Sequence, residues 1–421
     1  MGKYSKFIVE SLNQLLEKRL LQIIAPVMPF NDDPKVFHYN LSAKTTKEIT
    51  SGRLRSFQAS GVSLDSREFA LFKSLAETLE RLGSNVYSED TLIKGSYENL
   101  LRNKHSAVDP HLFKTVPGIR QKTFKWFAST DVLLQKKILI PAQLVFLNYI
   151  YDSEIHLSSE VNTTGCAGGF DHETTLLRGI YELIEREAYL AVFLARLTPK
   201  LIDLTTHPDP KIKKILAVCK RYNLELNTVD ITNDLQIPTF MSLLFDKTGL
   251  GQAFTSGLKS HLNPNMALSG SIEEAFNTRP WYRRNIYAKK NNNKLNSQFV
   301  HSHNDRALFW SSPKQIPKIS FLFRSKPISW QYAQYNSSSH KQLGHIKNIL
   351  LNKKFLLYYA NITPTNIAPP NYLVYKVFVP QLQPYYIDES AKEIYMERIV
   401  EIAKCFGREN FNLNTMPHFF L

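Results

Sequence analysis

One short acidic pattern occurs twice in this chain and constrains it more than any other feature. Glu77–Arg81 and Glu182–Arg186 both read Glu-x-x-Glu-Arg. Each copy lies in a stretch with helical periodicity, so its two glutamates share one helix face with an arginine next to them. Two carboxylates at this spacing repel each other. Repeating the arrangement makes sense if a cation lies between the copies, and Mg²⁺ suits an all-oxygen site.

The overall charge favours an anionic partner. The 421 residues include 52 Lys and Arg against 37 Asp and Glu, which gives a formal charge of +15. Nucleotide phosphates or an acidic peptide would complement this charge. The basic residues are spread along the chain without a nucleic-acid-binding motif, so nucleic acid is not the expected partner.

The cysteines and the apolar stretches limit where the protein works. Cys166, Cys219 and Cys405 form no Cys-x-x-Cys pair, so neither a zinc site nor a disulfide framework is predicted. Cys166 is interpreted as a small packing residue. The most apolar stretch is interrupted by Pro141 and Gln143 and is too short to span a bilayer. We therefore expect a cytoplasmic protein that has no membrane partner.

Periodicity divides the chain into an N-terminal extension, residues 1–55, and one large domain, residues 56–421. Residues 60–63 are predicted to form a turn, 163–170 a small-residue loop, and the Lys- and Asn-rich residues 287–299 a mobile loop. Helices and strands mix without regular βαβ alternation, which favours an α+β fold. Helices are predicted near residues 5–24, 72–79, 173–197, 212–219, 266–279 and 389–402, and strands near 132–134, 138–140, 224–231, 240–245, 355–360 and 372–379.

Five carboxylates are the strongest candidates for chemistry. If their helices converge, the charges need metal ions or arginines, because unpaired buried carboxylates cost several kcal/mol each. Two or three Mg²⁺ ions that bridge a triphosphate would neutralise them. The alternative, a solvated helix face with a local ion pair, is weakened but not removed by the repetition. The candidate glutamates are Glu77, Glu80, Glu182, Glu185 and Glu274.

Two arginines and a loop could add nucleotide contacts to this acidic site, whereas the other motifs considered give no support. Arg81 and Arg186 directly follow the glutamate pairs and could bind phosphate oxygens bidentately. The small-residue loop could offer backbone N–H groups to an anion at a helix start, although a tight turn explains it equally. The P-loop and Gly-x-Gly-x-x-Gly patterns are absent. His301 and His303 lack a matching ligand pair and are expected to be exposed rather than metal-bound.

Taken together, these segments resemble the YcaO-domain family. Residues 60–63 with 75–81 are similar to the family's first ATP motif, 163–168 with 179–186 to the second, and 267–279 to the third. Residues 230–238 and 379–384 are also similar, and the likeness runs from about residue 56 to the C-terminus. The resemblance implies a single large YcaO-type domain of mixed sheets and helices.

The resemblance also implies a chemistry. YcaO proteins bind ATP and Mg²⁺ without a P-loop and activate a peptide-backbone amide oxygen. A Cys, Ser or Thr side chain of the substrate then gives an azoline, and a sulfide donor gives a thioamide. The residues that match the family's Mg²⁺ positions are Glu77, Glu80, Glu182, Glu185 and Glu274. Those that match its ATP or phosphate positions are Ser63, Arg81, Thr164, Gly165 and Arg186.

Three differences from the family pattern bear on activity. Pro417–Leu421 keeps the frame of the Pro-His-Pro-Phe-Pro-like tail of azoline-forming members, without two of its prolines. Thr174 stands where a glutamate is usual, and Gly270 where an arginine is usual, with Arg283 or Arg284 as possible replacements. These losses leave open a non-catalytic relative that binds a peptide or a protein.

The resemblance finally implies partners. The substrate would be a ribosomally made precursor peptide. Because no leader-binding module precedes the domain in this sequence, we expect a separate leader-peptide-binding protein to deliver it. A homodimer is also expected, because members of the family tend to form dimers.

Overall fold

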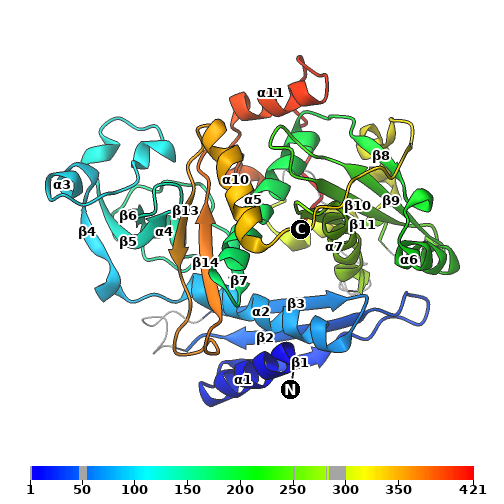
Figure 1. Cartoon of the computed structure of the whole chain (residues 1–421), viewed down its shortest axis with the longest axis horizontal. Coiled ribbons are helices and arrows are strands. Elements are labelled where there is room, and N and C mark those ends of the chain that lie inside the picture. The colour runs from blue at the N-terminus through cyan, green and yellow to red at the C-terminus, as the bar shows by residue number, and fades with distance from the viewer. Residues whose placement is uncertain (1, 47–54, 250–251, 281, 284–299) are drawn as a thin grey trace.

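The computed structural model describes residues 2–46, 55–249, 252–280, 282–283 and 300–421 (Figure 1). Helices and strands mix without βαβ alternation, which confirms the α+β fold class. The α-helices are α1 (Lys3–Glu17), α2 (Arg67–Asn85), α3 (Tyr97–Arg102), α4 (Ala142–Val145), α5 (His172–Leu194), α6 (Pro210–Arg221), α7 (Pro264–Asn277), α9 (His303–Trp310), α10 (Ser339–Asn352) and α11 (Met396–Cys405).

The strands of the described residues form three sheets. Their pairing is antiparallel, as expected for an α+β fold, except between β12 and β8. The first sheet has the order β1 (Leu21–Pro26), β2 (Phe37–Lys44), β3 (Ser56–Ser63). The second has the order β11 (Phe254–Ser260), β10 (Thr239–Asp246), β9 (Leu224–Asp230), β8 (Lys200–Asp203), β12 (Ile328–Ser329). The third has the order β4 (Ile93–Ser96), β5 (Thr123–Asp131), β13 (Tyr358–Asn361), β14 (Leu373–Phe378), β7 (Cys166–Gly169), with β6 (Lys136–Pro141) paired to β5.

Helix α5 is the central element of the fold. It lies between the second and third sheets, with the first sheet and α1 below it in the view of Figure 1. Asp171 caps its start by accepting a hydrogen bond from the Thr174 N–H at 2.8 Å. Its last eight residues, 187–194, are buried on every face, as expected for a helix enclosed by neighbouring layers. The glutamate pair Glu182 and Glu185 comes just before this stretch, and Glu185 is itself buried.

Two strand–helix pairs share an unusually close approach. A Cβ atom on Gly61 of β3 would lie 2.0 Å from the carbonyl oxygen of Ala70 in α2. A Cβ atom on Gly257 of β11 would lie 2.1 Å from that of Ser271 in α7. Only glycine permits this contact between backbones. The approach brings glutamates on each helix within reach of the N–H groups of the adjoining strand.

The structure confirms α2, α5, α6 and α7 but corrects several other assignments. The helix predicted near residues 5–24 ends at Glu17, and residues 21–24 belong to strand β1. Residues 60–63 are not a turn, because Ser60 and Gly61 pair with Asn40 and Tyr39 of β2. The small-residue loop is wrong for residues 166–169, which pair with β14 as strand β7. The first hairpin strand ends at Asp131, so residues 132–134 belong to the turn. The last helix does not begin at residue 389 but at Met396.

The N-terminal residues share the core of the domain. Strands β1 and β2 complete the sheet of β3, and Phe7 of α1 packs on Phe72 of α2 with ring centroids 5.0 Å apart. The domain boundary at residue 55 stays a prediction, and residues 287–299 lie outside the described residues. In the described part of the chain, every helix is too short or too polar to cross a membrane.

Candidate functional site

A cavity of about 1780 Å³ brings the candidate residues together. Helices α2, α5 and α7 and strands β3, β7 and β11 all contribute side chains to its wall. The lining includes the five predicted carboxylates and three of the predicted nucleotide contacts: Glu77, Glu80, Glu182, Glu185, Glu274, Arg81, Thr164 and Arg186.

Each of the five carboxylates accepts a hydrogen bond from a backbone N–H group. The donors lie on β3, β7, β11 and the turn before β7, so each strand that approaches a helix orients a glutamate of that helix. The fold therefore fixes the acidic side chains before any ligand binds. The bonds are Ser60 N to Glu77 (2.7 Å), Gly168 N to Glu80 (2.7 Å), Gly165 N to Glu182 (3.2 Å), Ser260 N to Glu185 (3.1 Å) and Leu258 N to Glu274 (2.6 Å).

Burial is the main cause that disfavours the charged form of three of these carboxylates, and neighbouring carboxylates add to it. Burial, reinforced by the charges of Glu182 and Glu77, raises the pKa of Glu80 to about 8. Burial, with Glu274 and Glu182 nearby, raises the pKa of Glu185 to about 7, and burial also raises the pKa of Glu274. Near neutral pH the cluster therefore holds protons that a bound cation would displace.

The two arginines of the repeated motif are bonded to glutamates four residues earlier. Arg81 Nη2 lies 2.6 Å from Glu77 Oε1, and Arg186 Nη2 lies 3.2 Å from Glu182 Oε1. The Arg186 guanidinium also stacks over the Tyr385 ring, 4.3 Å from its centroid. Both guanidinium groups thus line the cavity in fixed positions.

The other three predicted nucleotide contacts differ in how they relate to the cavity. Thr164 lines the cavity, and within the described residues its buried hydroxyl has no hydrogen-bond partner. Gly165 has a φ of 82° and donates its N–H to Glu182 at 3.2 Å. Ser63 is buried outside the cavity lining, and its Oγ accepts the N–H groups of Asp65 and Ser66. Ser63 therefore stabilises the turn before α2.

The two departures from the family pattern both lie at the cavity. Thr174 bonds its hydroxyl to that of Ser339 at 3.1 Å. Gly270 lines the wall on α7. Arg283 does not replace the missing arginine, because it forms ion pairs with Asp32 and Asp33 at 2.9 Å. Arg284 lies outside the described residues.

Two cationic residues at the site were missed by the sequence reasoning. Lys259 of β11 has its Nζ 3.6 Å from Glu185 Oε2. Arg178 of α5 lines the cavity and donates to the carbonyl of Gly168 at 2.7 Å. The position of Arg178, four residues before Glu182, was a usable signal because i and i+4 share a helix face. Lys259 lies on a strand that the sequence did not predict.

The C-terminal residues reach the same cavity. Phe419, Phe420 and Leu421 belong to its lining. Tyr189 Oη accepts the backbone N–H groups of Phe419 and Phe420 at 2.8 and 3.0 Å. His418 is fully buried, with its Nε2 2.8 Å from the Tyr386 carbonyl oxygen.

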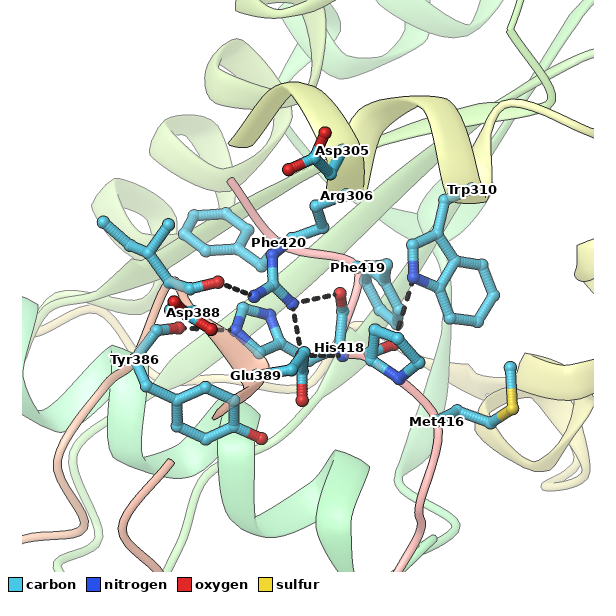
Figure 2. A network of polar contacts seen from close by, with 12 residues as sticks. Asp305, Arg306, Trp310, Tyr386, Asp388, Glu389, Met416, His418, Phe419 and Phe420 are labelled. Atoms are coloured by element: carbon cyan, nitrogen blue, oxygen red, sulfur yellow. Dashed lines mark hydrogen bonds and ion pairs between the residues drawn. The ribbon is translucent and has the colours of Figure 1, made fainter. Parts of the chain in front are cut away.

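Figure 2 shows how a buried arginine holds this tail. Arg306 Nη1 donates to the His418 carbonyl at 2.5 Å and to Glu389 at 2.8 Å. Trp310 Nε1 donates to the Pro417 carbonyl at 3.1 Å. The tail is thus a fixed part of the cavity wall.

The remaining candidates are two histidines and a cysteine. His301 is exposed and pairs with Asp388 at 2.8 Å. His303 is exposed as well, but it lines the cavity, which the sequence did not predict. Cys166 is a buried residue of the cavity wall, with its Sγ 3.2 Å from Ser84 Oγ.

The donor set fits magnesium and a nucleotide phosphate. Among the described residues, no three His, Cys, Asp or Glu side chains converge into a complete metal site. Mg²⁺ does not need one, because it commonly binds one or two carboxylates and completes its shell with phosphate and water. The oxygen-only donors and the raised pKa of Glu80 and Glu185 both match a site that gains from divalent cations.

Comparisons with known proteins agree with this geometry. The sequence model described as YcaO cyclodehydratase, ATP- and Mg²⁺-binding, matches residues 64–383. An uncharacterized protein of Methanothermobacter thermautotrophicus is 25% identical over 217 residues, which are 51% of this chain and 55% of that protein. An uncharacterized protein in the tfuA 3′ region of Rhizobium leguminosarum bv. trifolii is 24% identical over 210 residues, 49% of each chain. The chain spans about half the length of these relatives.

Solved structures show the same fold. A heterocyclase in complex with substrate and cofactor has a TM-score of 0.75 at 16% identity, over 98% of this chain and 57% of that one. YcaO from Methanopyrus kandleri, bound with AMPPCP and Mg²⁺, has a TM-score of 0.67 at 14% identity, over 93% and 94%. A chain of the E. coli microcin synthetase McbBCD complex has a TM-score of 0.61 at 12% identity, over 86% and 87%. The family model matches residues 64–383, well over half of this chain. This chain therefore belongs to the YcaO family.

Proposed function

We propose that the protein uses ATP and Mg²⁺ to activate backbone amides of a ribosomally made precursor peptide, and that it cyclodehydrates Cys, Ser or Thr residues to azolines. One observation carries the proposal. Five glutamates from three helices line one cavity, and each is oriented by a backbone N–H group. This is a prepared site for cations that carry a polyphosphate.

The residues of the cavity would divide the work by their chemistry. Glu80, Glu185 and Glu274 are the carboxylates whose raised pKa values mark them as the main sites for Mg²⁺. Arg81 and Arg186 are held where they can donate to phosphate oxygens. Bound Mg-ATP would supply the phosphoryl group that turns the amide oxygen into a good leaving group.

The size of the cavity supports a peptide substrate. Its volume of about 1780 Å³ exceeds the roughly 300–1000 Å³ of ordinary small-molecule pockets, so a peptide segment has room beside a nucleotide. We propose that a separate leader-binding protein delivers the peptide, in line with the complexes among the similar structures. A homodimer and a cytoplasmic location, which the three free cysteines suit, complete the proposal.

The composition of the cavity also favours a second candidate, a YcaO protein that binds a peptide without modifying it. At position 174 the side chain is a threonine bonded to Ser339, and no carboxylate stands there. This removes one negative charge from the wall and weakens the case for the full complement of metal ions.

Calorimetry with Mg-ATP tests the first candidate. The proposal requires wild-type binding and a large loss in the Glu185→Gln variant, whose amide oxygen can still accept the Ser260 N–H. Glu17→Gln, at the exposed end of α1, is the matched control. Absence of wild-type binding would refute the ATP-dependent activity.

Mass spectrometry then identifies the product. Peptide, partner, protein and Mg-ATP together should yield a peptide that has lost water. Replacement of oxygen by sulfur would instead assign the thioamide reaction. Unmodified peptide together with tight Mg-ATP binding would favour the non-catalytic role.

A further inference from the structure

The side chain of Lys259, on strand β11, crosses helix α7 at Gly270. A Cβ atom on Gly270 would lie 2.7 Å from Cγ and 2.9 Å from Cδ of Lys259. Both atoms are in the middle of the lysine chain, so no small movement of its end would relieve the contact. Glycine weakens a helix interior relative to alanine, yet at this position only glycine leaves room for the lysine.

The ammonium group of this lysine faces the acidic cavity. Lys259 and Gly270 both line the wall, and the Lys259 side chain is 41% exposed. Its Nζ lies 3.6 Å from Glu185 Oε2, which is beyond the usual length of a hydrogen bond. The amine is therefore attracted to the cluster while its three N–H donors stay available for a ligand.

The other cations beside the glutamates are more firmly engaged. Arg81 and Arg186 are close to their own glutamates, at 2.6 and 3.2 Å, and Arg178 donates to a backbone carbonyl at 2.7 Å. Lys259 lies on strand β11, whereas Arg81 is on helix α2 and Arg178 and Arg186 are on helix α5. It therefore offers a phosphate group a donor from a different element of the cavity wall.

We propose that Lys259 binds the phosphate groups of the nucleotide, and that Gly270 is required because the lysine reaches the site across it. This inference rests on the proposed function, since it assigns a residue to Mg-ATP. It also explains why position 270 is glycine where the family usually has arginine. The cation comes from Lys259 on strand β11, and the glycine in helix α7 leaves room for its side chain.

The test is a double-mutant cycle on Mg-ATP affinity, measured by calorimetry. Lys259→Ala should weaken binding by about 10- to 100-fold, the worth of a hydrogen bond to a charged group. Gly270→Ala should weaken it in the same range, because one added methyl group displaces the lysine chain. In the Lys259→Ala background, Gly270→Ala should have no further effect, and Lys259→Arg should keep most of the affinity.

Two controls distinguish this from a change in folding. Gly344→Ala in α10 adds a methyl group with no atom within 4 Å, so it should leave affinity unchanged. In thermal unfolding, the melting temperature of Gly270→Ala should be at least that of wild type, so that its loss of Mg-ATP affinity does not come from a loss of folding. Wild type that does not bind Mg-ATP overturns the proposed function. If wild type binds Mg-ATP, two results would overturn only the role of Lys259. One is an unchanged affinity in Lys259→Ala, and the other is an equal loss of affinity on adding Gly270→Ala to wild type and to Lys259→Ala.

Discussion

Glu80 makes the metal-free protein less stable at high pH, and replacing it with glutamine should remove this penalty. Glu80 lies in the cavity wall with its Oε1 2.7 Å from the Gly168 N–H. Glutamine has the same shape and still accepts that hydrogen bond, but it cannot ionise. The comparison of Glu80→Gln with wild type therefore isolates the cost of one charge in the acidic cluster.

The size and sign of the effect follow from the pKa of Glu80, which burial and its neighbours raise from an ordinary 4.5 to about 8. Between these values the folded state keeps a proton that the unfolded chain releases, so wild-type stability falls as pH rises. The difference sets an upper bound of about 5 kcal/mol, which water in the cavity reduces. We expect the Glu80→Gln variant to gain about 2 to 3 kcal/mol over wild type between about pH 5 and about pH 8.

Denaturant unfolding in the presence of a metal chelator, at several pH values, measures this gain. Glu17→Gln is the control, because its side chain is exposed at the end of α1. Added Mg-ATP should reverse the order, since the cations bind the charged form and stabilise wild type by mass action. A stability difference between Glu80→Gln and wild type that stays constant across this pH range would refute the reasoning about the cluster.

Three further predictions concern stability and the tail. Arg398→Met should cost about 3–5 kcal/mol in denaturant unfolding, because it leaves the fully buried Glu187, now bonded at 2.8 Å, without its cation; a loss below about 1 kcal/mol would contradict this. Gly61→Ala should lower the melting temperature and cost about 3 kcal/mol or more, since its methyl group would lie 2.0 Å from a backbone oxygen. Gly344→Ala, in open space, should instead be neutral or stabilise by up to about 1 kcal/mol, and similar losses in both would be inconsistent with the strand–helix contact. Arg306→Leu should expose residues 417–421 to carboxypeptidase and shift the Trp310 fluorescence to longer wavelength, because Arg306 holds the His418 carbonyl; unchanged digestion would show that packing alone retains the tail.

The helices of the site could be predicted from sequence, and its strands could not. Helix α2 combines an apolar stripe with a Ser66 cap, and α5 follows an Asp171 cap, so both carry the ordinary start signals of helices. Strands β3, β7 and β11 are rich in Gly, Ser and Ala, which do not favour strands. Their pairing partners give no local signal either, because the register depends on residues far away in the chain.

The composition of these strands and the geometry of the site have the same cause. At β3 and β11, a backbone N–H group reaches a glutamate on a neighbouring helix where strand and helix lie unusually close. That closeness excludes the large apolar residues by which strands are normally recognised. Gly61 and Gly257 meet their helices at almost the same distance, 2.0 and 2.1 Å for an added Cβ atom. The relation between Lys259 and Gly270 extends this rule to a side chain, since a small residue on one element makes room for a charge carried by the other. A search of YcaO sequences for the site cations should therefore consider the strand and the helix together, because a glycine in the helix does not by itself mean that the charge has been lost.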